Sequence, residues 1–339
     1  MTNEYDSIWP INVGHVSVDG QVPTLRRVLS GLYSLDQCLA SETGGSGIPL
    51  RGGIEIYGKW ETGKSTLAYF LAGRISQSWG PESRRIALVD LEGGAREEYL
   101  RSSISQSGFE GTVYRVPFNA KGQPRNHEDM LQEGADLLLE DDVRCVILDS
   151  AAMTQPISER EGEMEEAFMG RRAQVLAKFS RRCLAWINSE EEDKLFIVVN
   201  HMLQDMGGYG KISPGGDTLK FGINARLWIK RADASTPLPS GAFEAEIAVE
   251  KLRFGGKNKD RKGRVVILPE VGVSPELTAA FDCMELKLAR RQAGTGMVQY
   301  LGADGNWVDV DLLKNLIVEL LNGKGKEAFQ PFYDILKRQ

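Results

Sequence analysis

One motif constrains the fold most strongly, the run Gly58-Lys59-Trp60-Glu61-Thr62-Gly63-Lys64-Ser65, which fits the phosphate-binding pattern G-x-x-x-x-G-K-[ST]. It lies between an expected strand, Gly53 to Tyr57, and an expected helix, Ser65 to Gln77. Backbone N–H groups of such a loop point at phosphate oxygens, and the helix N-terminus adds its dipole. We expect Lys64 to reach the terminal phosphates, Ser65 to hold Mg²⁺, and Thr66 to complete the nucleotide contacts. The alternative is a glycine-rich turn without a ligand.

Short β-rich runs alternate with helical stretches from Ser30 onwards, which indicates a mostly parallel sheet covered by helices. We expect further strands at Arg85 to Asp90, Arg144 to Leu148 and Leu195 to Asn200, and a long helix from Glu165 to Ser189. Three later runs are interpreted as edge strands, namely Arg226 to Lys230, Glu244 to Glu250 and Arg264 to Leu268. Helical spacing recurs at Pro275 to Arg290 and Val310 to Leu321.

The chain therefore divides into three expected parts. Residues 1–30 form a short N-terminal arm and possible oligomerisation element, 31–270 an α/β core, and 271–339 a small α/β C-terminal domain. With 339 residues and 42% hydrophobic residues, the chain can bury one large core and a smaller one.

Composition narrows the class of protein. Apolar runs long enough to span a bilayer are absent, and residues 1–10 carry two acids and no basic residue, so we expect a cytoplasmic protein without a membrane partner. The four cysteines are far apart and lack metal-ligand spacing. A net charge of −6 argues against whole-surface attraction to nucleic acid, so DNA contact would need a local basic groove.

Polar residues follow three of the expected strands, at the edge where parallel sheets bind their ligands. Asp149 is suited to face the Mg²⁺ beside Ser65, although a helix N-cap is the alternative. Glu92, preferred to Asp90, can polarise an attacking water, or is simply a solvated loop acid. His201 can touch the γ-phosphate, whereas a lone histidine is more often structural.

Several ordered blocks resemble the RecA family of bacterial and phage recombinases. These blocks are Ser30 to Asp36, Gly53 to Gly58 running into the loop, Asp90 to Glu92, Val146 to Ser150, Gly162-Glu163, Met169-Gly170, Val199 to His201, and Gly215 to Phe221. The match covers about Ser30 to Leu268 well and continues more loosely to Trp307. The resemblance implies a RecA-like P-loop ATPase that uses ATP and Mg²⁺, forms helical filaments on single-stranded DNA and pairs it with homologous double-stranded DNA. Mediator and single-strand-binding proteins would be further partners.

The resemblance also implies roles for individual residues. Glu92 becomes the catalytic carboxylate, Tyr99 stacks on adenine, and the residue at 201 couples the γ-phosphate to a DNA-binding loop that follows it. Bacterial members have glutamine at that position, while this chain, like a phage branch of the family, has Asn200-His201. Arg96 stands where an acid is usual, which puts the choice of base in doubt.

Two loops are expected to contact DNA, at about 159–172 and 202–218. Glycines with a few apolar side chains suit a strand held by backbone N–H groups, although a plain surface loop is the alternative. Arg181 and Arg182 extend a basic ridge for phosphates from the first loop, or are ordinary solvated arginines. The candidate DNA contacts are Met169, Gly170, Arg171, Arg172, Arg181, Met206, Tyr209, Lys211, Gly215 and Gly216.

Lys251 and Arg253 sit where the family places two cations that reach the ATP of a neighbouring subunit, so hydrolysis would need assembly. Exposed cations that guard a strand edge are the alternative. Lys220 and Phe221 belong either to this interface or to the core. Two other functions stay open for the whole chain: a regulator of the same fold that acts through protein partners, and a hexameric helicase.

Overall fold

The computed structural model describes residues 17–18, 22–23, 26–40, 45–80, 85–120, 123–158, 170–189, 193–204, 211–212, 219–220, 222–233, 238–253 and 262–339. The central strands are β5 (Gly52–Gly58), β6 (Arg85–Asp90), β7 (Thr112–Arg115), β10 (Val143–Asp149), β11 (Leu195–His201), β14 (Ile223–Arg231), β15 (Phe243–Leu252), β16 (Lys262–Leu268) and β17 (Gly272–Ser274). The helices are α1 (Tyr33–Cys38), α2 (Lys64–Gln77), α3 (Glu97–Ser105), α4 (His127–Asp136), α6 (Arg171–Ser189), α8 (Pro275–Glu285), α9 (Leu313–Leu321) and α10 (Gln330–Leu336).

Short strands and turns complete the chain. The strands are β1 (Ser17–Val18), β2 (Val22–Pro23), β3 (Arg27–Val28), β4 (Ile48–Pro49), β8 (Asn119–Ala120), β9 (Gln123–Pro124), β12 (Leu203–Gln204), β13 (Lys211–Ile212), β18 (Ala289–Arg291), β19 (Met297–Leu301) and β20 (Trp307–Leu312). Turns of 3₁₀ helix cover Leu137–Leu139, Ala151–Met153, Pro239–Gly241 and Lys326–Phe329.

A nine-stranded sheet organises the fold, in the order β17-β16-β15-β14-β5-β11-β10-β6-β7. The strands from β14 to β7 run parallel, and β15, β16 and β17 are added antiparallel. The predicted α/β class with a mostly parallel central sheet is confirmed.

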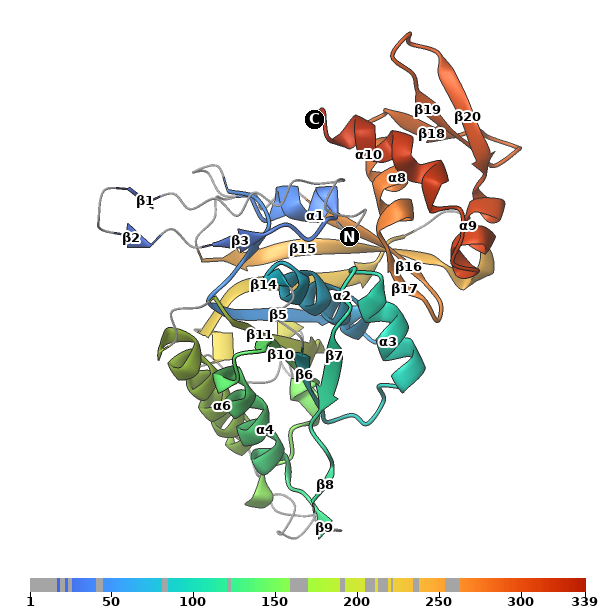
Figure 1. Cartoon of the computed structure of the whole chain (residues 1–339). Helices are drawn as coiled ribbons and strands as arrows, with labels where there is room; N and C mark the ends of the chain where they lie inside the picture. Colours follow the sequence, from blue (N-terminus) through green and yellow to red (C-terminus); the bar gives the residue numbers. More distant parts are fainter. Residues whose placement is uncertain are drawn as a thin grey trace.

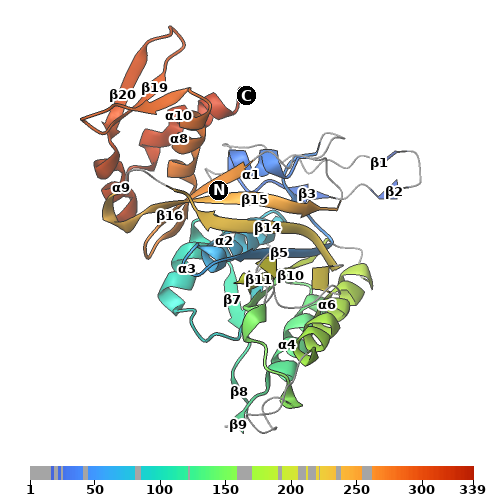
Figure 2. The same ribbon diagram turned by 180° about the vertical axis from the view of Figure 1, so that it is seen from behind.

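Helices cover both faces of the sheet (Figures 1 and 2). Helices α1, α2 and α3 pack on one face, where Ile54, Ile56 and Ile147 project from the strands. Helices α4 and α6 pack on the other face, against Val146 and Phe196. Strands buried on both sides read as continuous apolar runs, which is why β10 and β11 were recognisable from sequence.

The C-terminal residues form a second core beside the sheet, visible in red in Figure 1. Helices α8, α9 and α10 pack around Phe329 and Phe332, next to a three-stranded sheet of β18, β19 and β20. Strand β17 pairs with β16, so the central sheet continues past residue 270. The three-part division of the chain stays a prediction, and most of residues 1–30 lie outside the described part.

Two expectations about later elements were wrong. The runs in β14, β15 and β16 are not at an edge, because each has a neighbour on both sides and the described edges are β17 and β7. Their half-exposed alternation reflects a face that helices do not fully cover. The helices at 275 and 310 were also too long: α8 ends at Glu285, and Val310 belongs to β20. The run Trp307–Leu312 alternates with period two, which is a strand pattern.

The predicted long helix is α6, which the structure describes from Arg171; residues 159–169 lie outside the described part. Helix α6 is amphipathic and packs its apolar side over the sheet and against α4. Among the described helices, none is long and apolar enough to cross a membrane.

The parallel strands place the functional residues at one edge of the sheet. Strands β5, β6, β10 and β11 lie next to one another in the order β5-β11-β10-β6, and their carboxyl ends meet at one sheet edge. Asp149 and His201 are the last residues of β10 and β11, and the phosphate-binding loop and Glu92 come at the ends of β5 and β6.

Candidate nucleotide site

Two glycines in the loop between β5 and α2 are needed for its path. Gly63 has a left-handed φ of +87°, and a Cβ there would lie 2.1 Å from Ile267 Cδ1. A Cβ on Gly58 would lie 2.1 Å from the carbonyl oxygen of Ile229. A side chain at position 58 would collide with the backbone of strand β14, and the left-handed φ at position 63 favours glycine, so both glycines allow the loop to reach the start of α2.

Lys64 is the buried cation of the loop. Its ammonium donates a hydrogen bond of 2.6 Å to the carbonyl oxygen of Lys59, which also accepts one of 3.0 Å from Thr62 Oγ1. Burial lowers the pKa of Lys64, while the negative charges of Asp149 and Glu92 oppose this shift. A buried ammonium whose hydrogen bond among the described residues goes to a carbonyl oxygen suits the negative oxygens of a triphosphate. The side chains of Lys59, Trp60 and Glu61 are exposed around the loop.

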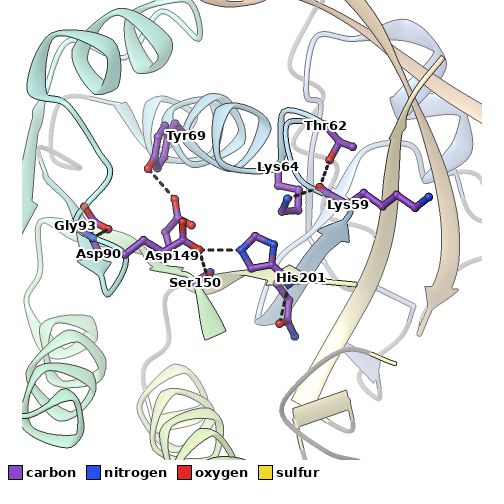
Figure 3. Close-up of polar contacts among 11 residues, drawn as sticks. Lys59, Thr62, Lys64, Tyr69, Asp90, Gly93, Asp149, Ser150 and His201 are labelled. Atoms are coloured by element: carbon purple, nitrogen blue, oxygen red, sulfur yellow. Dashed lines mark hydrogen bonds and ion pairs between the residues drawn. The ribbon is translucent and has the colours of Figure 1, made fainter. Parts of the chain in front are cut away.

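Asp149 ends strand β10 beneath the start of α2. Its Oδ2 accepts a hydrogen bond of 2.8 Å from the Tyr69 hydroxyl (Figure 3), and its carboxylate is also hydrogen-bonded to Ser65. Burial raises the pKa of Asp149 to about 6. A hydroxyl next to a buried carboxylate is an oxygen donor set that Mg²⁺ prefers, so Ser65 and Asp149 fit this ion.

Helix α3 brings Tyr99 to the same site. The Tyr99 hydroxyl lies 2.5 Å from Thr66 Oγ1 and hydrogen-bonds to it. The predicted nucleotide contacts from the loop, from α2 and from α3 are therefore neighbours in space. Stacking of Tyr99 on a base stays a prediction, and the side chain of Arg96 is exposed at the start of α3.

Glu92 joins two strand ends. Its Oε1 accepts a hydrogen bond of 2.5 Å from Ser150 Oγ, after β10, and lies 2.8 Å from His201 Nε2, at the end of β11. The hydrogen bond from His201 lowers the pKa of Glu92, an effect that outweighs burial, and Ser150 and Lys64 add to it. Glu92 therefore stays ionised at neutral pH, as a general base must.

Asp90 has a different environment. Its two carboxylate oxygens accept hydrogen bonds from the backbone N–H groups of Gly93 (2.8 Å) and Ala95 (3.1 Å), and Arg115 forms an ion pair with it. These contacts shape the turn that carries Glu92. The preference for Glu92 over Asp90 as the base stays a prediction.

The predicted DNA contacts are placed less completely. Strands β12 and β13 pair antiparallel at the base of the second loop, and Lys211 lies in β13. Arg171 and Arg181 are exposed on α6, whereas Arg182 is held by Asp136 in a two-point ion pair and lies over the Trp186 ring, so the expected ridge is interrupted. Gly170 precedes α6, and Arg172 lies in its first turn. Met169, Met206, Tyr209, Gly215 and Gly216 lie outside the described residues.

The candidate interface residues lie near the ends of β14 and β15. The Lys251 ammonium donates a hydrogen bond of 2.5 Å to the carbonyl oxygen of Lys220. The backbone N–H of Arg253 donates one of 2.8 Å to the carbonyl of Asn224, and its side chain is exposed. Phe221 lies outside the described residues. Within one subunit, neither cation contacts the loop around Lys64 through a described bond.

Sequence reasoning missed three supporting groups. Tyr69 holds Asp149, Ser150 holds Glu92, and Glu55 holds the Asn200 side chain. Tyr69 lies in helix α2 and Glu55 in the apolar run of β5, and the sequence patterns of both elements predict core residues at these positions. A charged residue inside a buried strand was the one available signal.

A pH dependence follows from Asp149. Because its pKa is raised to about 6, Asp149 takes up a proton as the pH falls through that value and loses its affinity for Mg²⁺. We expect the Mg²⁺-dependent part of ATP affinity to fall by up to about tenfold per pH unit below 6. The buried, ionised carboxylate of Asp149 lowers the free energy of unfolding above pH 6. This destabilisation disappears as the pH falls from 6 towards the ordinary pKa of an aspartate, because the folded protein then binds the proton.

Fluorescence titration with a labelled ATP analogue between pH 5 and 8, with and without Mg²⁺, measures this effect. ATP itself titrates in this range, so Asp149→Asn is the reference: its slope contains the contribution of the nucleotide and of the other groups, without that of Asp149. Equal slopes for the two proteins would contradict the role of Asp149.

Comparisons with known proteins identify relatives of this chain. A family model described as the RecA N-terminal domain matches residues 18–252. Protein RecA of Oceanobacillus iheyensis is 25% identical over 289 residues, which cover 84% of this chain and 72% of that protein. Protein RecA of Latilactobacillus sakei is 30% identical over 219 residues, covering 64% and 56%, and that of Clostridium acetobutylicum is 24% identical over 318 residues, covering 90% and 77%. The matched regions thus span from just over half to about three quarters of these relatives.

Proposed function

The chain belongs to the RecA family, and on that premise we propose that it is a DNA-dependent ATPase that forms filaments on single-stranded DNA and promotes homologous pairing and strand exchange. Its roles would be recombination and DNA repair. One observation carries the proposal: Glu92 and His201 share a hydrogen bond beside Lys64, and the chain runs from His201 directly into the hairpin β12–β13.

Each residue has a defined task in this proposal. Lys64 and the N-terminal N–H groups of α2 bind the β- and γ-phosphates, and Ser65 and Asp149 hold Mg²⁺. When bound there, Mg²⁺ would neutralise charge that develops on the phosphates during transfer. The Glu92 carboxylate orients a water for attack in line with the leaving group and accepts its proton.

His201 links nucleotide to DNA. Its Nε2 contacts Glu92, and its ring lies 5.4 Å from that of Trp60. A γ-phosphate near Lys64 offers this imidazole a second acceptor. The N–H of Met202 donates a hydrogen bond to the carbonyl of Gly58, so the backbone just before β12 is fixed to the end of β5. In this proposal, a rotation of the neighbouring His201 side chain changes the hairpin that follows.

Assembly would complete the active site. Lys251 and Arg253 are proposed to reach the nucleotide of an adjacent subunit, which makes hydrolysis depend on the homo-oligomer. Arg171, Arg181 and the loop around β12–β13 would then face the DNA strand. The DNA contact is local, because the whole chain has a net charge of −6.

Gel-shift experiments with single-stranded DNA test the proposal, with and without a slowly hydrolysed ATP analogue. We expect a shift that requires nucleotide and weakens steeply with salt. Electron microscopy of the same sample should show helical filaments. Closed rings would favour the helicase function, and absence of DNA binding in both conditions would favour the regulator.

A further inference from the structure

A chain of polar side chains crosses the buried part of the sheet behind the nucleotide site. Its centre is Glu55 in strand β5, which has no exposed surface. Glu55 Oε1 accepts a hydrogen bond of 2.9 Å from Asn200 Nδ2, and its Oε2 accepts one of 2.6 Å from Arg226 Nε. Both carboxylate oxygens are thus in use, and each binds a different neighbouring strand, β11 or β14.

The Asn200 side of this chain leads to His201. The Asn200 amide oxygen accepts a hydrogen bond of 3.0 Å from the backbone N–H of His201. An amide that donates to Glu55 and accepts from His201 has one orientation open to it. Glu55 therefore fixes Asn200, and Asn200 fixes the backbone from which the His201 imidazole extends to Glu92.

The Arg226 side leads to the candidate interface cations. Arg226 donates a hydrogen bond of 3.0 Å to Glu250 and lies 4.1 Å over the Tyr57 ring. The register between β14 and β15 shifts here: Arg226 faces Lys251, but the next pair is Leu227 with Val249, which leaves Glu250 as an extra residue. Bulges of this kind change where the following side chains point.

The pKa of Lys251 also indicates that Arg226 lies close to the two candidate interface cations. Burial and then the charges of Arg253 and Arg226 lower the pKa of Lys251, so the three cations lie close together. A buried ion pair is seldom the most stable filling for a core, because apolar residues of the same volume often stabilise as well or better. Packing alone does not account for Glu55 and Arg226 inside the sheet.

We propose that Glu55 and Arg226 are positioning residues of the ATPase site, which hold His201 on one side and the segment with Lys251 and Arg253 on the other in a fixed relation. The inference rests on the proposed ATPase activity. Neither residue touches the reacting atoms; they act through Asn200 and through the bulge at Glu250.

Kinetics of the full chain on single-stranded DNA test the proposal with Glu55→Gln and Arg226→Lys. We expect kcat for ATP hydrolysis to fall by about 10- to 100-fold, because small displacements of supporting groups have effects of this size. The KM for ATP should change less than about threefold, since the loop around Lys64 is left intact. The matched control is Lys230→Gln, a cation on the same strand that is paired 3.5 Å from Glu246 outside the chain of contacts. It should leave both constants unchanged.

A second measurement needs no activity. The protein contains three histidines, so selective ¹⁵N-histidine labelling gives three backbone amide signals, with that of His201 identified by its loss in His201→Gln. In the nucleotide-free protein, Glu55→Gln and Arg226→Lys should shift the His201 signal and leave that of His127 in place. Lys230→Gln should shift neither. Glu250→Gln alters the exposed end of the chain of contacts and leaves the core untouched. It should move the His201 signal less than Glu55→Gln and Arg226→Lys do.

The two readouts separate the possible failures. A shifted His201 signal without ATPase activity in any variant, wild type included, would reject the proposed function and leave the positioning intact. Normal activity with an unmoved His201 signal in Arg226→Lys and Glu250→Gln would overturn the positioning role. A uniform loss of kcat and thermal stability with no shift at His201 would reduce Glu55 and Arg226 to structural residues.

Discussion

Lys64→Ala is expected to lower kcat for ATP hydrolysis by about 100- to 1000-fold, the usual loss when one charge-stabilising donor is removed. The same variant should lose nucleotide-dependent binding of single-stranded DNA. Lys64 is the buried cation of the loop, its ammonium is held by one carbonyl oxygen, and Asp149 and Glu92 lie near enough to influence its pKa. Without it, two carboxylates would face the triphosphate uncompensated.

Lys59→Ala is the matched control for this prediction. Lys59 lies in the same loop, but its side chain is exposed and only its backbone carbonyl contacts Lys64. Steady-state hydrolysis and gel shifts with an ATP analogue should therefore change less than about threefold. Equal losses in Lys59→Ala and Lys64→Ala would mean that the loop as a whole, and not the buried ammonium, determines the activity.

Much of the fold was predictable because its central strands are buried on both faces. Runs such as Val146–Leu148 and Ile197–Val199 contain only apolar residues, and they locate β10 and β11 without further information. Strands that are half exposed carry a weaker signal. The order β14-β5-β11 places β5 between two strands that are distant from it in sequence, and nothing in an alternating pattern says that β14 will choose such a neighbour.

The site was predictable where a residue follows a strand. Glu92, Asp149 and His201 were each proposed from that position, and the structure brings them around Lys64. Their roles stay predictions. The supporting groups were not predictable, because Tyr69 and Glu55 lie inside elements whose patterns indicate core. Which buried polar residue meets which partner depends on strand order and register, here β5 next to β11 and β14.

Glu92→Gln is expected to separate binding from turnover, in contrast to Lys64→Ala. Removal of a general base lowers kcat by about 100- to 10,000-fold. The amide can still accept the hydrogen bond from Ser150, so the site keeps its shape, but it cannot take a proton from water. ATP and single-stranded DNA should therefore still bind, and the complexes should persist longer than those of the wild type because ATP is not consumed.

The control for Glu92→Gln is Glu97→Gln, five residues further along. Glu97 is exposed on α3 and pairs only with Arg101, at 2.8 Å, among its described contacts. Single-turnover hydrolysis and the lifetime of DNA complexes in gel shifts should be the same as in the wild type. If Glu92→Gln turned over ATP within about threefold of the wild-type rate, the base would have to be another group, and Asp90 is a poor substitute because backbone N–H groups and Arg115 already occupy its oxygens.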